Sequence, residues 1–133
     1  RPHTVHCGPD GIYISAIGDP GGDGPGGIFL LDHDDFSVKG AWENDRGPQE
    51  LSYDFWWNLN HDTVITSEWG TPNMVEDGLQ GDLLLGNKYG HKLHIWDLDK
   101  RRHKQEIDLG SEHQMVLELR PAQEIVAAVA GVR

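Results

Sequence analysis

The chain has 133 residues and a formal net charge of −11, with 11 basic and 22 acidic residues, eight histidines and one cysteine. This length suits one small domain, and the acidic balance argues against nucleic acid and anionic membrane surfaces as partners. A single cysteine excludes an intrachain disulfide and a zinc site built from thiolates alone. The histidines leave open a metal site based on imidazole.

The two ends of the chain do not look like natural termini. The sequence begins at Arg1 and ends in the apolar stretch 127–133. We therefore expect a piece of a longer protein, cut at both ends, in which targeting signals cannot be observed. No apolar run approaches the roughly 20 residues that a membrane helix needs, so we expect no membrane insertion and a soluble protein, cytoplasmic or periplasmic.

Short β-type segments follow one another along the chain, separated by loops rich in Gly, Pro and Asp. The predicted strands are, in order, 11–18, 28–32, 36–43, 51–57, 63–69, 92–98, 104–109 and 113–120. The stretch 124–132 fits a broken final strand, although a helix is the alternative. No long amphipathic helix is predicted anywhere, so the fold class is all-β.

The hairpin 51–69 is the predicted centre of this structure. It combines aromatic and β-branched residues with the polar turn 58–62. Trp56 and Trp57 are adjacent, so in a strand they point to opposite faces, and both faces of the hairpin should be covered. The long connection that follows, at about 71–90, contains Leu83–Leu85 and is predicted to be an insertion that packs over the sheet.

An internal repeat predicts the architecture. The segment IYISAIG at 12–18 aligns with VITSEWG at 64–70, and IFLLD at 28–32 aligns with LHIWD at 93–97. Units of about 50 residues with four short antiparallel strands are typical of propeller blades. We therefore predict that 1–133 is part of a single β-propeller domain, with about two to two-and-a-half four-stranded blades. A β-sandwich with similar strand spacing is the alternative.

The N-terminal sequence RPHTVHC concentrates three possible metal ligands, His3, His6 and Cys7. In a regular strand His3 and His6 face opposite sides, so both can bind one metal only if the segment is a loop or contains a bulge. The alternative is one buried histidine and one ordinary buried cysteine, and Cys7 could also be a reactive thiol.

The remaining histidines are assigned simpler roles. His94 is expected to pack or form a hydrogen bond within a blade, while His33, His61 and His103 lie in turn-like sequence and are expected to be solvated. His113 precedes an apolar segment, where it could line a channel or the end of a blade.

Four sequence blocks resemble the selenium-binding protein family, whose bacterial and animal members include methanethiol oxidases. These blocks are HTVHC, GDGPGGIFLLD, YDFWWNLNHDTVITSEWGTPN and YGHKLHIWDL. The resemblance runs from Arg1 to about Pro121 with the blocks in the order of the family, and the tail after Ala122 departs from it. It implies a seven-bladed propeller several times longer than this chain.

The resemblance also implies an activity, the oxidation of methanethiol by oxygen and water to formaldehyde, hydrogen sulfide and hydrogen peroxide, with copper as the metal. It makes His3 and His6 the first candidates for copper ligands and His113 a secondary one, with further ligands outside the chain. Cys7 is a fallback for selenium or thiol binding, and Glu112 or Asp10 could orient the ligating histidines.

The implied partners are a small thiol or selenium species and the remaining blades. The fragment alone is expected to be inactive. The alternative function is a non-catalytic selenium- or thiol-binding propeller that acts as a carrier or an interaction scaffold.

Overall fold

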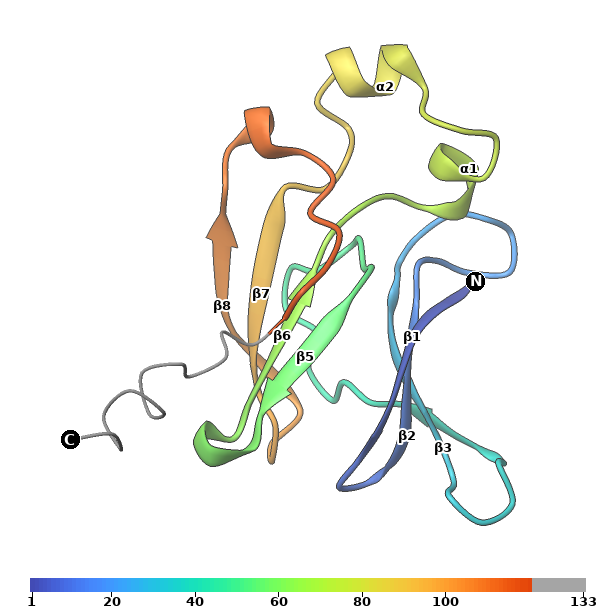
Figure 1. Ribbon diagram of the computed structural model, residues 1–133, viewed down its shortest axis with the longest axis vertical. Helices are drawn as coiled ribbons and strands as arrows, with labels where there is room; N and C mark the ends of the chain where they lie inside the picture. Colours follow the sequence, from blue (N-terminus) through green and yellow to red (C-terminus); the bar gives the residue numbers. More distant parts are fainter. Residues whose placement is uncertain (121–133) are drawn as a thin grey trace, which may run out of the picture.

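The computed structural model describes residues 1–120, which form two antiparallel sheets of four strands each (Figure 1). The first sheet contains β1 (Pro2–Gly8), β2 (Gly11–Ala16), β3 (Gly27–Leu31) and β4 (Val38–Ala41). The second contains β5 (Phe55–Asn58), β6 (Thr63–Ser67), β7 (Lys92–Asp97) and β8 (Arg102–Asp108). In each sheet the strands lie side by side in chain order, so no strand crosses from one sheet to the other. This order confirms the all-β class and the two propeller-like blades, and it differs from the Greek-key order of a sandwich.

The sequence repeat is confirmed at the level of strand pairing. Ile12 of β2 pairs with Leu31 of β3, and the aligned residue Val64 of β6 pairs with Trp96 of β7. The first strands repeat in the same way, because Cys7 pairs with Ile12 as Trp57 pairs with Val64. Each repeat therefore builds the same sheet in the same register.

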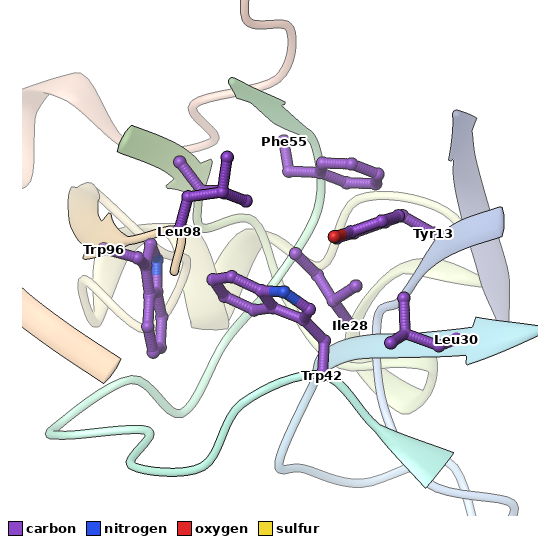
Figure 2. Packing of buried hydrophobic residues seen from close by; sticks show 8 residues of the cluster. Tyr13, Ile28, Leu30, Trp42, Phe55, Trp96 and Leu98 are labelled. Carbon is purple, nitrogen blue, oxygen red and sulfur yellow. The ribbon is translucent and has the colours of Figure 1, made fainter. Parts of the chain in front are cut away.

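The core lies between the two sheets and is dominated by large aromatic side chains (Figure 2). It consists of Tyr13, Ile28, Leu30, Trp42, Phe55, Val64, Trp96 and Leu98. The indole rings of Trp42 and Trp96 meet edge to face with centroids 5.8 Å apart, which is a favourable geometry for aromatic pairs. Because both sheets contribute to this cluster, it fixes how one blade sits against the next.

Helical turns are short and occupy the connections. One 3-10 turn, η1 (Leu59–His61), connects β5 to β6, and a second, η2 (Ser111–His113), follows β8. The connection between β6 and β7 contains α1 (Pro72–Val75) and α2 (Gly81–Leu85), so Leu83–Leu85 are helical. Among residues 1–120, no helix is long and apolar enough to cross a membrane.

The structure corrects two of the predicted strands. The segment 113–120 alternates in polarity but forms the turn η2 followed by irregular chain, because a strand also needs a pairing partner and none is present among the described residues. Strand β5 begins at Phe55 and not at 51, because the backbone before it leaves the regular strand pairing. The N–H of Tyr53 donates to the carbonyl of Ser67, and the N–H of Ser67 donates to the carbonyl of Asp54, so two consecutive residues share one partner. The prediction for 124–132 lies outside the described residues.

Candidate functional site

A bulge in β1 places the two histidines of the HTVHC sequence. Pro2 pairs with Ala16 and Val5 with Ile14, so β1 contains one more residue than β2 between these pairs. A bulge re-aims the side chains of its strand. The ring of His3 lies 3.7 Å from that of Tyr53, and the ring of His6 packs edge-on against Trp56 at 4.6 Å. Both rings therefore contact the segment that leads into and forms β5.

The ring of His3 is attached to a buried carboxylate through one hydroxyl group. Its Nδ1 atom lies 2.9 Å from Oγ1 of Thr4, and Thr4 Oγ1 donates a 2.6 Å hydrogen bond to Oδ1 of Asp54. The side chain of His3 is exposed, whereas Asp54 is only 2% exposed. A chain of hydrogen bonds thus runs from the surface of the first sheet to a buried acid beside β5.

Asp54 also ties three stretches of the chain together. Oδ1 accepts the backbone N–H of Phe55, and Oδ2 accepts the backbone N–H of Leu119 at 2.7 Å and the guanidinium of Arg120 at 3.2 Å. Backbone N–H groups and a guanidinium can only donate, so both carboxylate oxygens accept in these contacts. The acid is therefore a fixed part of the junction between β1, β5 and the segment after η2.

Tyr53 completes the surroundings of His3. Burial, followed by the charges of Glu118 and Asp54, raises the pKa of its phenol above the ordinary value. The phenol therefore stays protonated and neutral while its ring packs on His3 and, at 4.7 Å, on Trp69.

His6 has a buried nitrogen without a partner. Its ring is surrounded by Phe55, Trp56 and Trp57, with centroids at 5.3, 4.6 and 5.7 Å. Nε2 is inaccessible to solvent and makes no hydrogen bond with any of residues 1–120. A buried polar atom in this state needs an explanation, such as an ion or a ligand.

These two histidines fit part of a copper site. Imidazole nitrogen is a suitable ligand for copper, and the unpartnered Nε2 of His6 and the exposed ring of His3 both offer one. Nowhere within 1–120 do three or more His, Cys, Asp or Glu side chains come together in a group that could hold a metal ion. Any further ligands would therefore lie outside the described residues.

The other predicted site residues lie elsewhere. His113 is exposed at the end of η2, and Cys7 is an exposed free thiol in β1. Asp10 accepts a 2.8 Å hydrogen bond from the hydroxyl of Tyr13 and pairs with Arg101, and Glu112 is exposed in η2. Neither acid forms a hydrogen bond with a histidine within the described chain, whereas the carboxylate of Asp54 reaches His3 through Thr4.

A second histidine cluster lies inside the second sheet. His94 is fully buried, with Nε2 3.0 Å from Oε1 of Glu68 and Nδ1 3.0 Å from Nε2 of His103. His94 thus forms hydrogen bonds within its blade, as predicted. His103 was predicted to be solvated but is half-buried, because its position in β8 directs the ring against Trp96 and His94. Burial, followed by the charge of His94, lowers the pKa of His103.

Comparison with known proteins places these features in one family. The profile of the family "56kDa selenium binding protein (SBP56)" matches residues 1–132. A methanethiol oxidase of Xenopus laevis is 44% identical over 119 residues, which cover 89% of this chain and 25% of that protein. A methanethiol oxidase of Danio rerio is 40% identical over 129 residues, or 96% of this chain and 28% of that protein.

A crystal structure of a hypothetical selenium-binding protein from Sulfolobus tokodaii is also similar. It is 54% identical and superposes with a TM-score of 0.86 over 91% of this chain and 26% of its own. The chain therefore spans about a quarter of the length of the relatives that it matches.

Proposed function

Because the chain belongs to the 56 kDa selenium-binding protein family, we propose that the full-length protein is a copper-dependent methanethiol oxidase. The reaction converts methanethiol, oxygen and water to formaldehyde, hydrogen sulfide and hydrogen peroxide. Relatives that carry this name at 40–44% identity support the proposal. Within the chain itself, the proposal is carried by the Nε2 atom of His6, which is buried and has no hydrogen-bond partner among the described residues. The bulge in β1 lies close to His6, and His3 packs against Tyr53, in the segment that leads into β5.

His3 and His6 would be two of the ligands of the copper ion. Bound copper would favour the thiolate form of methanethiol and mediate electron transfer to oxygen. The electrons come from the methyl carbon, because sulfur is at the same oxidation level in methanethiol and in hydrogen sulfide. The protein's part is to fix the imidazole rings. Phe55, Trp56 and Trp57 pack around the ring of His6, and Tyr53 packs against the ring of His3.

Further ligands would come from other blades of the same propeller. The face of the first sheet that points away from the core carries a row of cross-strand neighbours, Val5, Ile14, Phe29 and Ala41. Val5 is 55% exposed in the described chain. On the second sheet, Trp56, Ile65 and Ile95 form a similar row. Apolar rows of this kind are buried against neighbouring blades in propellers, so additional blades on both sides would complete the domain.

The copper content of the full-length protein tests the proposed site. The protein is purified after growth with added copper, alongside a His3→Ala/His6→Ala variant and a His33→Ala control, whose histidine lies exposed in a turn. We expect stoichiometric copper in the wild type and the control and its loss from the folded double variant. Equal copper in all three proteins would remove His3 and His6 from the site. A folded wild-type protein without copper would contradict the proposed copper-dependent oxidase. It would favour the alternative function, a propeller that binds selenium or a thiol without catalysis.

A further inference from the structure

We infer that Thr4 and Asp54 hold His3 in the tautomer that carries its proton on Nδ1, so that Nε2 presents the free lone pair. This assigns both residues a positioning role that the sequence motif does not reveal. The tautomer follows from hydrogen bonds within the chain alone, whereas its use in copper binding rests on the proposed function.

The direction of the hydrogen bonds follows from a count of donors. Besides Thr4, the partners of Asp54 are the N–H groups of Phe55 and Leu119 and the guanidinium of Arg120, all of which only donate. Asp54 is therefore an acceptor, and the 2.6 Å contact with Thr4 is a hydroxyl donating to a carboxylate.

The hydroxyl of Thr4 has one hydrogen atom, and Asp54 receives it. In the 2.9 Å contact with His3, Thr4 Oγ1 can then only accept, so Nδ1 of His3 must carry a hydrogen atom. In the neutral imidazole the other nitrogen, Nε2, is unprotonated. No hydrogen bond to Nε2 of His3 occurs within residues 1–120.

The chain of hydrogen bonds is held in place on both sides. The backbone N–H of Thr4 donates to Oγ of Ser15 at 2.9 Å, and Ser15 Oγ donates to the carbonyl of Tyr53 at 2.7 Å. Ser15 is fully buried. The bulge, this serine and the ring of Tyr53 therefore fix Thr4 and His3 before any ligand arrives.

This arrangement resembles the one found at metal-binding histidines. A ligating imidazole commonly donates its other N–H to a carboxylate, a backbone carbonyl or water, which fixes the tautomer and increases the basicity of the ligating nitrogen. Here the hydroxyl of Thr4, bonded to the carboxylate of Asp54, takes the place of that acceptor. Loss of such a partner typically lowers metal affinity by about 10–100-fold. Thr4→Val should therefore weaken copper binding although Thr4 does not touch the metal.

The test is nitrogen NMR of the copper-free, full-length protein with isotope-labelled histidine, at a pH where imidazole is neutral. The signal of His3 is assigned by its disappearance in a His3→Gln variant. We expect the Nδ1–H pattern in the wild type, in Thr4→Ser, which keeps the hydroxyl, and in the control Thr63→Val, whose hydroxyl bonds to the carbonyl of His61. Thr4→Val should shift His3 towards the Nε2–H form and weaken copper(I) binding about 10–100-fold in a chelator competition.

Two results would overturn the inference: an Nε2–H pattern for His3 in the wild type, or an unchanged Nδ1–H pattern in folded Thr4→Val. Failure of the proposed function looks different. In that case the tautomer would respond to Thr4→Val as expected, but the copper content would not depend on His3.

Discussion

Thr66 is the acceptor for two buried donors, and its replacement by valine gives a sharp test of how the core is held together. Its Oγ1 receives the indole N–H of Trp96 at 3.0 Å and the side-chain amide of Gln49 at 2.9 Å. All three side chains are at most 1% exposed. Gln49 lies in the link between the two sheets, so this group fastens the link to β6 and β7.

The magnitude follows from the two donors that Thr66→Val would leave unpaired. Valine has nearly the shape of threonine, so no cavity opens and the loss comes from the hydrogen bonds. An unsatisfied buried donor costs about 1–3 kcal/mol, so two of them should lower the free energy of unfolding by about 2–6 kcal/mol. The same change at Thr63, in the same strand, affects a hydroxyl that bonds only to a turn carbonyl and should cost less than about 0.5 kcal/mol.

The assay is urea denaturation of the full-length protein, followed by tryptophan fluorescence, for the wild type, Thr66→Val and Thr63→Val. We expect a markedly lower unfolding midpoint for Thr66→Val only. If the two variants differ by less than about 0.5 kcal/mol, the hydrogen bonds to Thr66 do not support the core and the reasoning is refuted.

Two further predictions concern the second histidine cluster and the junction between repeats. Burial and the charge of His94 lower the pKa of His103 in the folded protein below its ordinary value of about 6.5. The contribution of neutral His103 to the free energy of unfolding is therefore complete above about pH 6.5 and is lost as the pH falls through the lowered pKa of the folded state. The urea midpoint of His103→Gln should therefore fall less on acidification than that of the wild type, and parallel pH profiles would contradict this. Ser67→Ala should cost about 1–3 kcal/mol in the same assay, because Ser67 Oγ accepts the N–H of Asp54 and donates to the carbonyl of Leu117. The exposed Ser37→Ala serves as its control, and equal midpoints for the two variants would exclude this bridge.

All strands of the two sheets except β1 could be predicted because their signals are local. The segment that forms β1, Pro2–Gly8, was not predicted to be a strand. Val64 and Thr66 alternate with Ile65 and Ser67, and this period belongs to a strand whatever lies around it. The sequence repeat then predicted that the two sheets are built alike. The pairing of Ile12 with Leu31 in the first sheet and of Val64 with Trp96 in the second confirms this prediction. The segment 113–120 shows the limit of such reasoning, since alternation does not supply a partner strand.

The candidate site was only partly predictable. The sequence identified His3 and His6, and their spacing indicated that a shared metal would require a loop or a bulge. That the segment is a strand with a bulge is visible only in the pairing of β1 with β2. Asp54 is far from both histidines in sequence, and only the packing of one repeat on the next brings it to Thr4.

His103 was misjudged for a related reason. Its charged neighbours in sequence are typical of a solvated turn, yet β8 starts at Arg102 and directs the His103 ring onto Trp96. The partial burial of His103 depends on the strand beside it, β7, and not on its neighbours in sequence.

Product formation from methanethiol by the copper-loaded, full-length protein tests the proposed activity most directly. We expect hydrogen sulfide, hydrogen peroxide and formaldehyde in equimolar amounts, and the loss of all three in the His3→Ala/His6→Ala variant. A folded, copper-loaded wild-type protein that binds methanethiol but releases none of these products would contradict the proposed activity.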